Sequence, residues 1–277
     1  MVETEENGVS APFGLGYQRI ADRVVQHASI QDGDIVVDVG TGTGLLAFAA
    51  FQAVGNTGKV IAVDLDAGCI QRCRERAAQL NLTNLAFREG DALSLPVESN
   101  HADVVLSRSV LCHIVDKEAA VSQWHRVLKK SGRFSLYEPI DRYDTRFSDL
   151  VDFSALGETA DRLREAEEAL HRNSNDPLMN FDEVELKRIL AATGFRDIEY
   201  HMVERSREYE MTSSLARTWW HKDIGGVSLP GHDSPYEVLG QYLPGKDLDA
   251  CVDFFCSKLN NRSITFESKQ VYMWGQK

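Results

Sequence analysis

A glycine at every second position, directly after a short β-branched run, is the feature that most constrains this fold. Gly40, Gly42 and Gly44 lie between the run Ile35–Val37 and the apolar stretch Leu45–Ala50. Glycine tolerates positive φ, and because it has no Cβ it lets a ligand approach the backbone closely. A buried strand, a glycine turn and the start of a helix together predict a strand-loop-helix unit that binds a nucleotide-like ligand.

The spacing of the glycines separates the possible ligands. A dinucleotide fingerprint reads G-x-G-x-x-G, and counted from Gly40 its third glycine would fall at position 45, where this chain has Leu45. The pattern that stands here, from Asp38 to Gly44, is D-x-G-x-G-x-G. The spacing therefore disfavours a nicotinamide-dependent oxidoreductase, which stays as an alternative.

Four further runs of strand type follow the loop, and each ends in polar residues. Ligands of open α/β sheets bind at the carboxyl ends of the strands, so these residues are expected to share one site. Asp64 stands about twenty residues past the loop, where an acidic side chain can accept hydrogen bonds from both ribose hydroxyls. The runs and their polar ends are Lys59–Val63 with Asp64, Leu85–Arg88 with Gly90-Asp91-Ala92, Asp103–Leu106 with Ser107, and Arg133–Tyr137 with Glu138.

In this order, the motifs resemble those of the class I S-adenosylmethionine-dependent methyltransferases, of the small-molecule, ubiquinone/menaquinone-methyltransferase-like type. The resemblance covers residues 30–140 well and residues 181–206 and 269–276 more loosely. It implies an α/β fold with a Rossmann-like, doubly wound, seven-stranded sheet whose last strand is antiparallel. It also implies S-adenosylmethionine as cofactor, S-adenosylhomocysteine as product, and in-line methyl transfer to an oxygen, nitrogen or carbon nucleophile of a small molecule.

The same resemblance implies roles for individual cofactor-binding residues. Asp38 would help hold the amino end of the cofactor, and Asp64 would bind its ribose. Asp91 would accept from the adenine amine, with the amide of Ala92 meeting a ring nitrogen. Tyr17 resembles aromatic residues that fold over the cofactor in relatives. The complete predicted set is Tyr17, Asp38, Gly40, Thr41, Gly42, Gly44, Asp64, Leu65, Asp91, Ala92 and Ser107.

Catalytic candidates come from the ends of the fourth and fifth strands. If the acceptor is a hydroxyl or an acidic carbon, a base must remove its proton, and a pKa near neutral suits that base. His113 is the first candidate and Glu138 the second. His113 could equally pack or donate to the acceptor, and a carboxylate or thiolate acceptor would need no base. The segment Ser107–His113 lacks the acidic or amide residue, prolines and aromatic residue that methyltransferases of DNA amino groups usually carry there.

Two insertions interrupt the expected core, and both would leave from the carboxyl edge of the sheet if the family topology holds. They are predicted to form a helical cap or lid over the cofactor's methyl group, because loops this long are usually functional. Trp219 and Trp220 either line an apolar acceptor pocket or only pack the lid onto the core. The predicted division is 1–29 for an N-terminal helical segment over the cofactor site, 30–141 with 181–206 and 269–277 for the core, and 142–180 with 207–268 for the insertions.

Composition narrows the partners and the location. The net charge is −12 with no basic stripe, so nucleic acid is an unexpected partner. No apolar stretch approaches the roughly 20 residues that cross a bilayer, so no membrane association is expected, and an acidic start is unlike a signal peptide. These features predict a cytoplasmic protein. The cysteines and histidines lack ligand spacing, so no metal site is expected. Oligomeric state and a catalytically silent, cofactor-binding regulatory role both stay open.

Overall fold

The computed structural model describes residues 14–221 and 233–277. Residues 1–13 of the predicted N-terminal segment and 222–232 of the second predicted insertion lie outside this description. The strands are β1 (Ile35–Val39), β2 (Lys59–Asp64), β3 (Leu85–Glu89), β4 (Ala102–Arg108), β5 (Leu128–Pro139), β6 (Arg196–Met211) and β7 (Arg262–Gln276).

These strands form one seven-stranded sheet in the order β3-β2-β1-β4-β5-β7-β6. β1 pairs in parallel with β2 and β4, and β4 pairs in parallel with β5. β7 is antiparallel to β5, with Val271 opposite Glu138. The strand order reverses between β1 and β4, which is where open α/β sheets bind their ligands. The predicted Rossmann-like sheet with an antiparallel last strand is confirmed.

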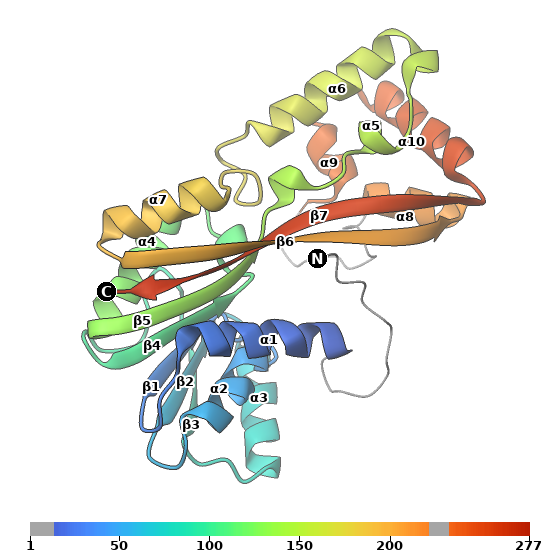
Figure 1. The fold of residues 1–277 in the computed structure, drawn as a ribbon. Helices are drawn as coiled ribbons and strands as arrows, with labels where there is room; N and C mark the ends of the chain where they lie inside the picture. Colours follow the sequence, from blue (N-terminus) through green and yellow to red (C-terminus); the bar gives the residue numbers. More distant parts are fainter. Residues whose placement is uncertain (1–13, 222–232) are drawn as a thin grey trace. The chain divides into compact units, whose positions relative to one another are not determined.

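Helices cover both faces of this sheet (Figure 1). Alternate strand residues such as Val36, Val104 and Leu106 pack under α1, α2 and α3 in one buried cluster. On the opposite face the Phe134 ring packs edge-on against Phe195, with 4.8 Å between centroids, beside α4 and α7. The helices of this doubly wound part are α1 (Gly14–Ala28), α2 (Leu45–Ala53), α3 (Ala67–Gln79), α4 (Lys117–Val127) and α7 (Glu183–Thr193), with the 3₁₀ turn η1 (Leu111–His113) before α4.

An aspartate caps the start of each of three helices. Asp66 accepts from the amide of Gly68 at 2.7 Å at the start of α3. Asp116 caps α4 in the same way, and Asp182 caps α7. Such side chains satisfy backbone donors that have no partner inside the helix. The caps fix where each helix leaves its strand and therefore how the connecting loops are aimed.

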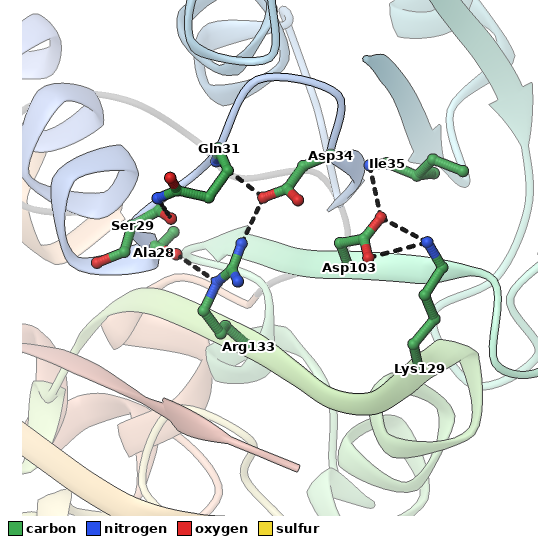
Figure 2. A network of polar contacts seen from close by, with 8 residues as sticks. All are labelled: Ala28, Ser29, Gln31, Asp34, Ile35, Asp103, Lys129 and Arg133. Carbon is green, nitrogen blue, oxygen red and sulfur yellow. Dashed lines mark hydrogen bonds and ion pairs between the residues drawn. The ribbon is translucent and has the colours of Figure 1, made fainter. Parts of the chain in front are cut away.

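A network of polar contacts joins the amino ends of the strands, at the edge away from the glycine loop (Figure 2). Arg133 of β5 forms an ion pair with Asp34, and its Nε donates to the last carbonyl of α1 at 3.1 Å. Asp103 of β4 accepts from Lys129 Nζ at 2.7 Å and from the Ile35 amide at 2.9 Å. The network therefore ties α1, β1, β4 and β5 together without using any predicted site residue.

The chain divides into two compact units. Over the described residues the first comprises 14–140, 181–203 and 270–277, and the second comprises 141–180, 204–221 and 233–269. We call the second the insertion unit. Its helices are α5 (Phe147–Leu150), α6 (Glu158–His171), α8 (Ser213–His221), α9 (Pro235–Leu239) and α10 (Gly245–Leu259), together with the 3₁₀ turns η2 (Asp141–Tyr143) and η3 (Ser154–Leu156).

β6 and β7 are longer than the sequence pattern indicates. The division between the units passes through both strands, so the insertion unit contains the strand segments 204–211 and 262–269 as well as helices. Within this unit Trp219 and Trp220 are fully buried. Trp220 stacks on Phe147 with 4.0 Å between ring centroids, and Trp219 meets Tyr209 edge-on at 4.9 Å. The tryptophans thus belong to a hydrophobic core internal to the insertion unit.

Among the described helices, none combines the length and apolar character needed to cross a membrane.

Candidate cofactor and active site

The three glycines of the loop after β1 adopt left-handed backbone conformations, with φ of 67° at Gly40, 53° at Gly42 and 88° at Gly44. A Cβ at Gly40 would lie 2.2 Å from Val110 Cγ2, and one at Gly44 would lie 2.5 Å from the Phe48 ring. No atom lies within 4 Å of the Cβ position at Gly42. Two of the glycines are therefore required by packing, while the third faces open space where a ligand can approach the backbone.

Asp64, at the end of β2, holds this loop in place. One of its carboxylate oxygens accepts from the Gly42 amide at 2.7 Å, and the other accepts from the Asp66 amide at 2.9 Å. A carboxylate oxygen can accept more than one hydrogen bond, so the predicted contacts with ribose hydroxyls remain available. The neighbouring Leu65 side chain is 72% exposed, which suits a residue that would cover an aromatic or sugar ring.

Asp38 is a buried carboxylate with an unused oxygen. The residue is 1% exposed, and its Oδ2 has no hydrogen-bond partner. Burial raises the pKa of Asp38 to about 7, and the nearby Thr41 hydroxyl, the Ala47 amide and the charge of Arg108 offset only part of that shift. Buried polar atoms are nearly always paired, so this one indicates a missing cation or donor. The ammonium group of S-adenosylmethionine has the required charge and chemistry.

The remaining predicted cofactor residues lie around the same edge of the sheet. Asp91 follows β3 and accepts from the Leu93 amide at 2.8 Å, and the Gly90 amide donates to the Asp64 carbonyl at 2.9 Å. The Ser107 hydroxyl, near the end of β4, is fully buried and has no partner. Tyr17 of α1 is 55% exposed, and the guanidinium carbon of Arg108 lies 5.5 Å from its ring centroid. Apart from Tyr17, which comes from α1, the predicted residues thus lie at or directly after the carboxyl ends of β1 to β4.

The two predicted catalytic residues differ sharply in environment. His113 is an exposed residue of η1. Glu138, near the end of β5, is fully buried, and its Oε1 accepts from the amides of Val110 and Leu111, each at 3.0 Å. Its Oε2 accepts from the Cys112 amide at 3.2 Å. Burial raises the pKa of Glu138, while these three amides oppose that shift.

Sequence reasoning missed Val110 and Phe48, whose side chains fill the space that Gly40 and Gly44 leave. Val110 meets the loop only through the fold, so no local sequence signal identifies it. Phe48 lies one helical turn after Gly44, and its amide donates to the Gly44 carbonyl at 2.9 Å, so its spacing was the available signal. Cys73 is another neighbour of the loop, because its thiol lies 3.4 Å from the Gly42 carbonyl. Burial raises the pKa of Cys73 to about 11, so it is a neutral thiol at physiological pH. Across residues 14–221 and 233–277 no group of three or more His, Cys, Asp or Glu is placed to hold a metal ion.

Comparison with known proteins agrees with this geometry. A family model described as "Methyltransferase domain" matches residues 30–194. The chain is 28% identical over 191 residues to the ubiquinone/menaquinone biosynthesis C-methyltransferase UbiE of Stutzerimonas stutzeri, a match that spans 67% of this chain and 75% of that one.

Two solved structures share the fold. One is a putative methyltransferase of Bacillus halodurans, at 17% identity with a TM-score of 0.57, covering 93% of this chain and 98% of that one. The other is phosphoethanolamine N-methyltransferase 2 of Haemonchus contortus in complex with S-adenosyl-L-methionine. It is 20% identical with a TM-score of 0.55, covering 98% of this chain and 54% of that one.

The sheet order, the glycine loop and these matches define a class I S-adenosylmethionine-dependent methyltransferase. The chain belongs to the methyltransferase domain family, and S-adenosylmethionine is its cofactor. Of the alternatives left open by the sequence, the methyltransferase is the supported one. The individual binding and catalytic roles remain predictions that the geometry allows.

Proposed function

We propose that this enzyme methylates a small-molecule acceptor at a carbon, nitrogen or oxygen nucleophile. The observation that carries the proposal is the unpaired, buried oxygen of Asp38, near the end of the strand that leads into the loop where Gly42 faces open space. It supplies a negative charge and a close backbone approach at the switch point of the sheet. A small-molecule acceptor is favoured by similarity to a relative whose name specifies ubiquinone and menaquinone biosynthesis.

In this proposal the residues of the carboxyl edge divide the work of binding. Asp38 pairs with the cofactor's ammonium group, and Asp64 accepts from the ribose hydroxyls. Asp91 and Ala92 meet the adenine, while Leu65 and Tyr17 cover its faces. When bound, the cofactor supplies a methyl carbon activated by sulfonium. The protein's contribution is to hold the nucleophile in line with that carbon and to exclude water.

Acceptor chemistry would decide whether a base is needed. For a hydroxyl or an acidic carbon, His113 is the proposed proton acceptor, because it is exposed and belongs to the segment that directly follows β4. We assign the choice of acceptor to the insertion unit, since the core motifs account for the cofactor and contain no acceptor-specific pattern. A cytoplasmic location also remains part of this proposal, consistent with the absence of any disulfide among the cysteines, all of which lie in the described part of the chain.

Calorimetric titration followed by an acceptor screen tests the proposal. The expected result is saturable binding of S-adenosylmethionine and S-adenosylhomocysteine, no comparable binding of reduced nicotinamide cofactor, and formation of S-adenosylhomocysteine with at least one quinol, amine or carboxylate acceptor. Asp38→Ala should abolish cofactor binding. Asp22→Ala, which removes an exposed carboxylate of α1, is the control and should bind normally. Tight cofactor binding without turnover across a broad panel would instead favour the silent, regulatory alternative.

A further inference from the structure

Glu138 accepts hydrogen bonds from three consecutive backbone amides on the segment that follows β4. The donors are Val110, Leu111 and Cys112, at 3.0, 3.0 and 3.2 Å, and both carboxylate oxygens are used. Val110 directly precedes η1, and Leu111 and Cys112 are its first two residues. Backbone N–H groups at the start of such a turn have no partner within it. A side chain from β5 thus caps a turn that begins after β4.

The capped segment also contacts the cofactor loop. Val110 provides the first of the three amides, and its Cγ2 lies 2.2 Å from where a Cβ at Gly40 would stand. The Val110 side chain therefore occupies the space that glycine leaves at position 40. Close packing of this kind transmits a displacement of one segment to the other, because interiors contain little free volume. Glu138, Val110 and Gly40 form a continuous chain of contacts from β5 to the loop after β1.

We propose that Glu138 is a positioning residue, which holds the Val110–His113 segment against the cofactor loop and takes no proton from the acceptor. The inference rests on the proposed function and deepens it. A general base must reach the proton that it removes. Glu138 is fully buried, and the three amides leave its carboxylate facing backbone rather than open space. The same contacts fix the backbone that presents His113.

Glu138→Gln separates the two roles, because the amide group keeps the size of the side chain but places N–H donors against backbone N–H donors. In the positioning role the substitution should speed hydrogen–deuterium exchange at Val110, Leu111 and Cys112 in the cofactor-free protein. It should also weaken S-adenosylmethionine binding by about tenfold or more, as expected for loss of charge-assisted hydrogen bonds to a buried group. The pH dependence of the remaining turnover should keep its shape. Glu98→Gln, at an exposed position before β4, is the charge-matched control.

A result with native exchange, native cofactor affinity and abolished turnover in Glu138→Gln would overturn the inference and make Glu138 the base. Failure of the wild-type protein to bind S-adenosylmethionine would refute the proposed function. The exchange measurement would still test whether Glu138 holds the Val110–His113 segment in place. If Glu138→Gln does not fold, Val110→Ala tests the same chain of contacts with the carboxylate intact. It should weaken cofactor binding, and Val110→Gly should partly restore the binding lost in Gly40→Ala by removing the atoms that the new Cβ meets. Unchanged cofactor affinity in Val110→Ala would also contradict the inference.

Discussion

The carboxyl ends of β1 and β5 each hold a buried carboxylate, but the two are used differently. Asp38 of β1 leaves Oδ2 without a partner, whereas Glu138 of β5 engages three backbone amides with both oxygens. Burial raises the pKa of both groups, and nearby groups of the protein offset part of each shift, but only Asp38 keeps one carboxylate oxygen without a hydrogen-bond partner. Asp38 thus offers an oxygen to a ligand, whereas the Glu138 carboxylate organises backbone, although both stand at the carboxyl edge of the sheet.

The largest expected effect is on cofactor affinity in Asp38→Asn. The substitution removes the negative charge that would meet the cofactor's ammonium group inside a buried site. Truncating one member of such a pair typically costs about 2–5 kcal/mol of binding free energy. Calorimetric titration at pH 8 should therefore show at least a thirtyfold loss of affinity, roughly the lower end of that range. Asp22→Asn should bind as the wild type does, and equal affinity in Asp38→Asn would remove Asp38 from the site.

The second effect concerns the pH dependence of the cofactor-free protein. The pKa of Asp38 is raised to about 7 in the folded state from a usual 3.8, so the folded chain keeps this proton over a range in which the unfolded chain has lost it. The native state should therefore lose up to about 4 kcal/mol from this group as the pH rises from 4 through 7, with each pKa unit worth about 1.4 kcal/mol.

Asp38→Asn should reduce this loss, which urea unfolding at pH 5 and pH 8 measures. The affinity for the cofactor should change with pH in the opposite direction to the stability, because the cofactor's ammonium group requires the ionised Asp38 carboxylate. The affinity of the wild type for S-adenosylmethionine should rise with pH up to about 7. An affinity that is flat between pH 6 and pH 8 would contradict an unpaired Asp38.

The third effect separates the two kinds of glycine at the β1 end. Gly40→Ala should destabilise the fold by about 2–3 kcal/mol, because the new Cβ meets Val110 and overpacking typically costs about 1–3 kcal/mol. Gly42→Ala meets no atom and should cost only about 1 kcal/mol for its left-handed backbone, while cofactor binding weakens. Thermal unfolding and titration of both variants test this. Equal stability of the two would mean that Val110 does not pack as described.

The carboxyl ends of β1 and β5 also differ in how much of their structure the sequence can predict. The glycine loop, Asp64 and Asp91 depend on local spacing after a strand, so their convergence follows once the parallel sheet is recognised. The partners of Glu138 are 26 to 28 residues away along the chain, and they meet it only through the packing of β4 beside β5. No local pattern indicates that Glu138 binds backbone, and its position after a strand indicates catalysis equally well.

The insertion unit shows a second limit of prediction from the sequence. Its tryptophans are recognisable in sequence as large apolar groups, but their burial against Phe147 and Tyr209 depends on contacts from separate segments. The outer part of β6 is rich in charged residues and largely exposed, so its strand character has little apolar periodicity to reveal it, and the outer part of β7 offers only the short alternation of Ile264 and Phe266. Helix caps such as Asp66 and Asp182 were predictable because the capping signal lies within one turn of the helix it starts.

The smallest expected effect lies at the opposite edge of the sheet, where the strands begin. Changes there should affect stability slightly and leave cofactor binding unchanged. Arg133→Met removes the ion pair with Asp34 and the hydrogen bond to the end of α1. Because the arginine is 30% exposed and solvent screens the pair, we expect a loss of only about 1 kcal/mol of stability. Lys129→Met, at a more exposed partner of Asp103, should cost less. Both variants should bind S-adenosylmethionine with native affinity, and weakened binding in either would show that the amino edge also shapes the cofactor site.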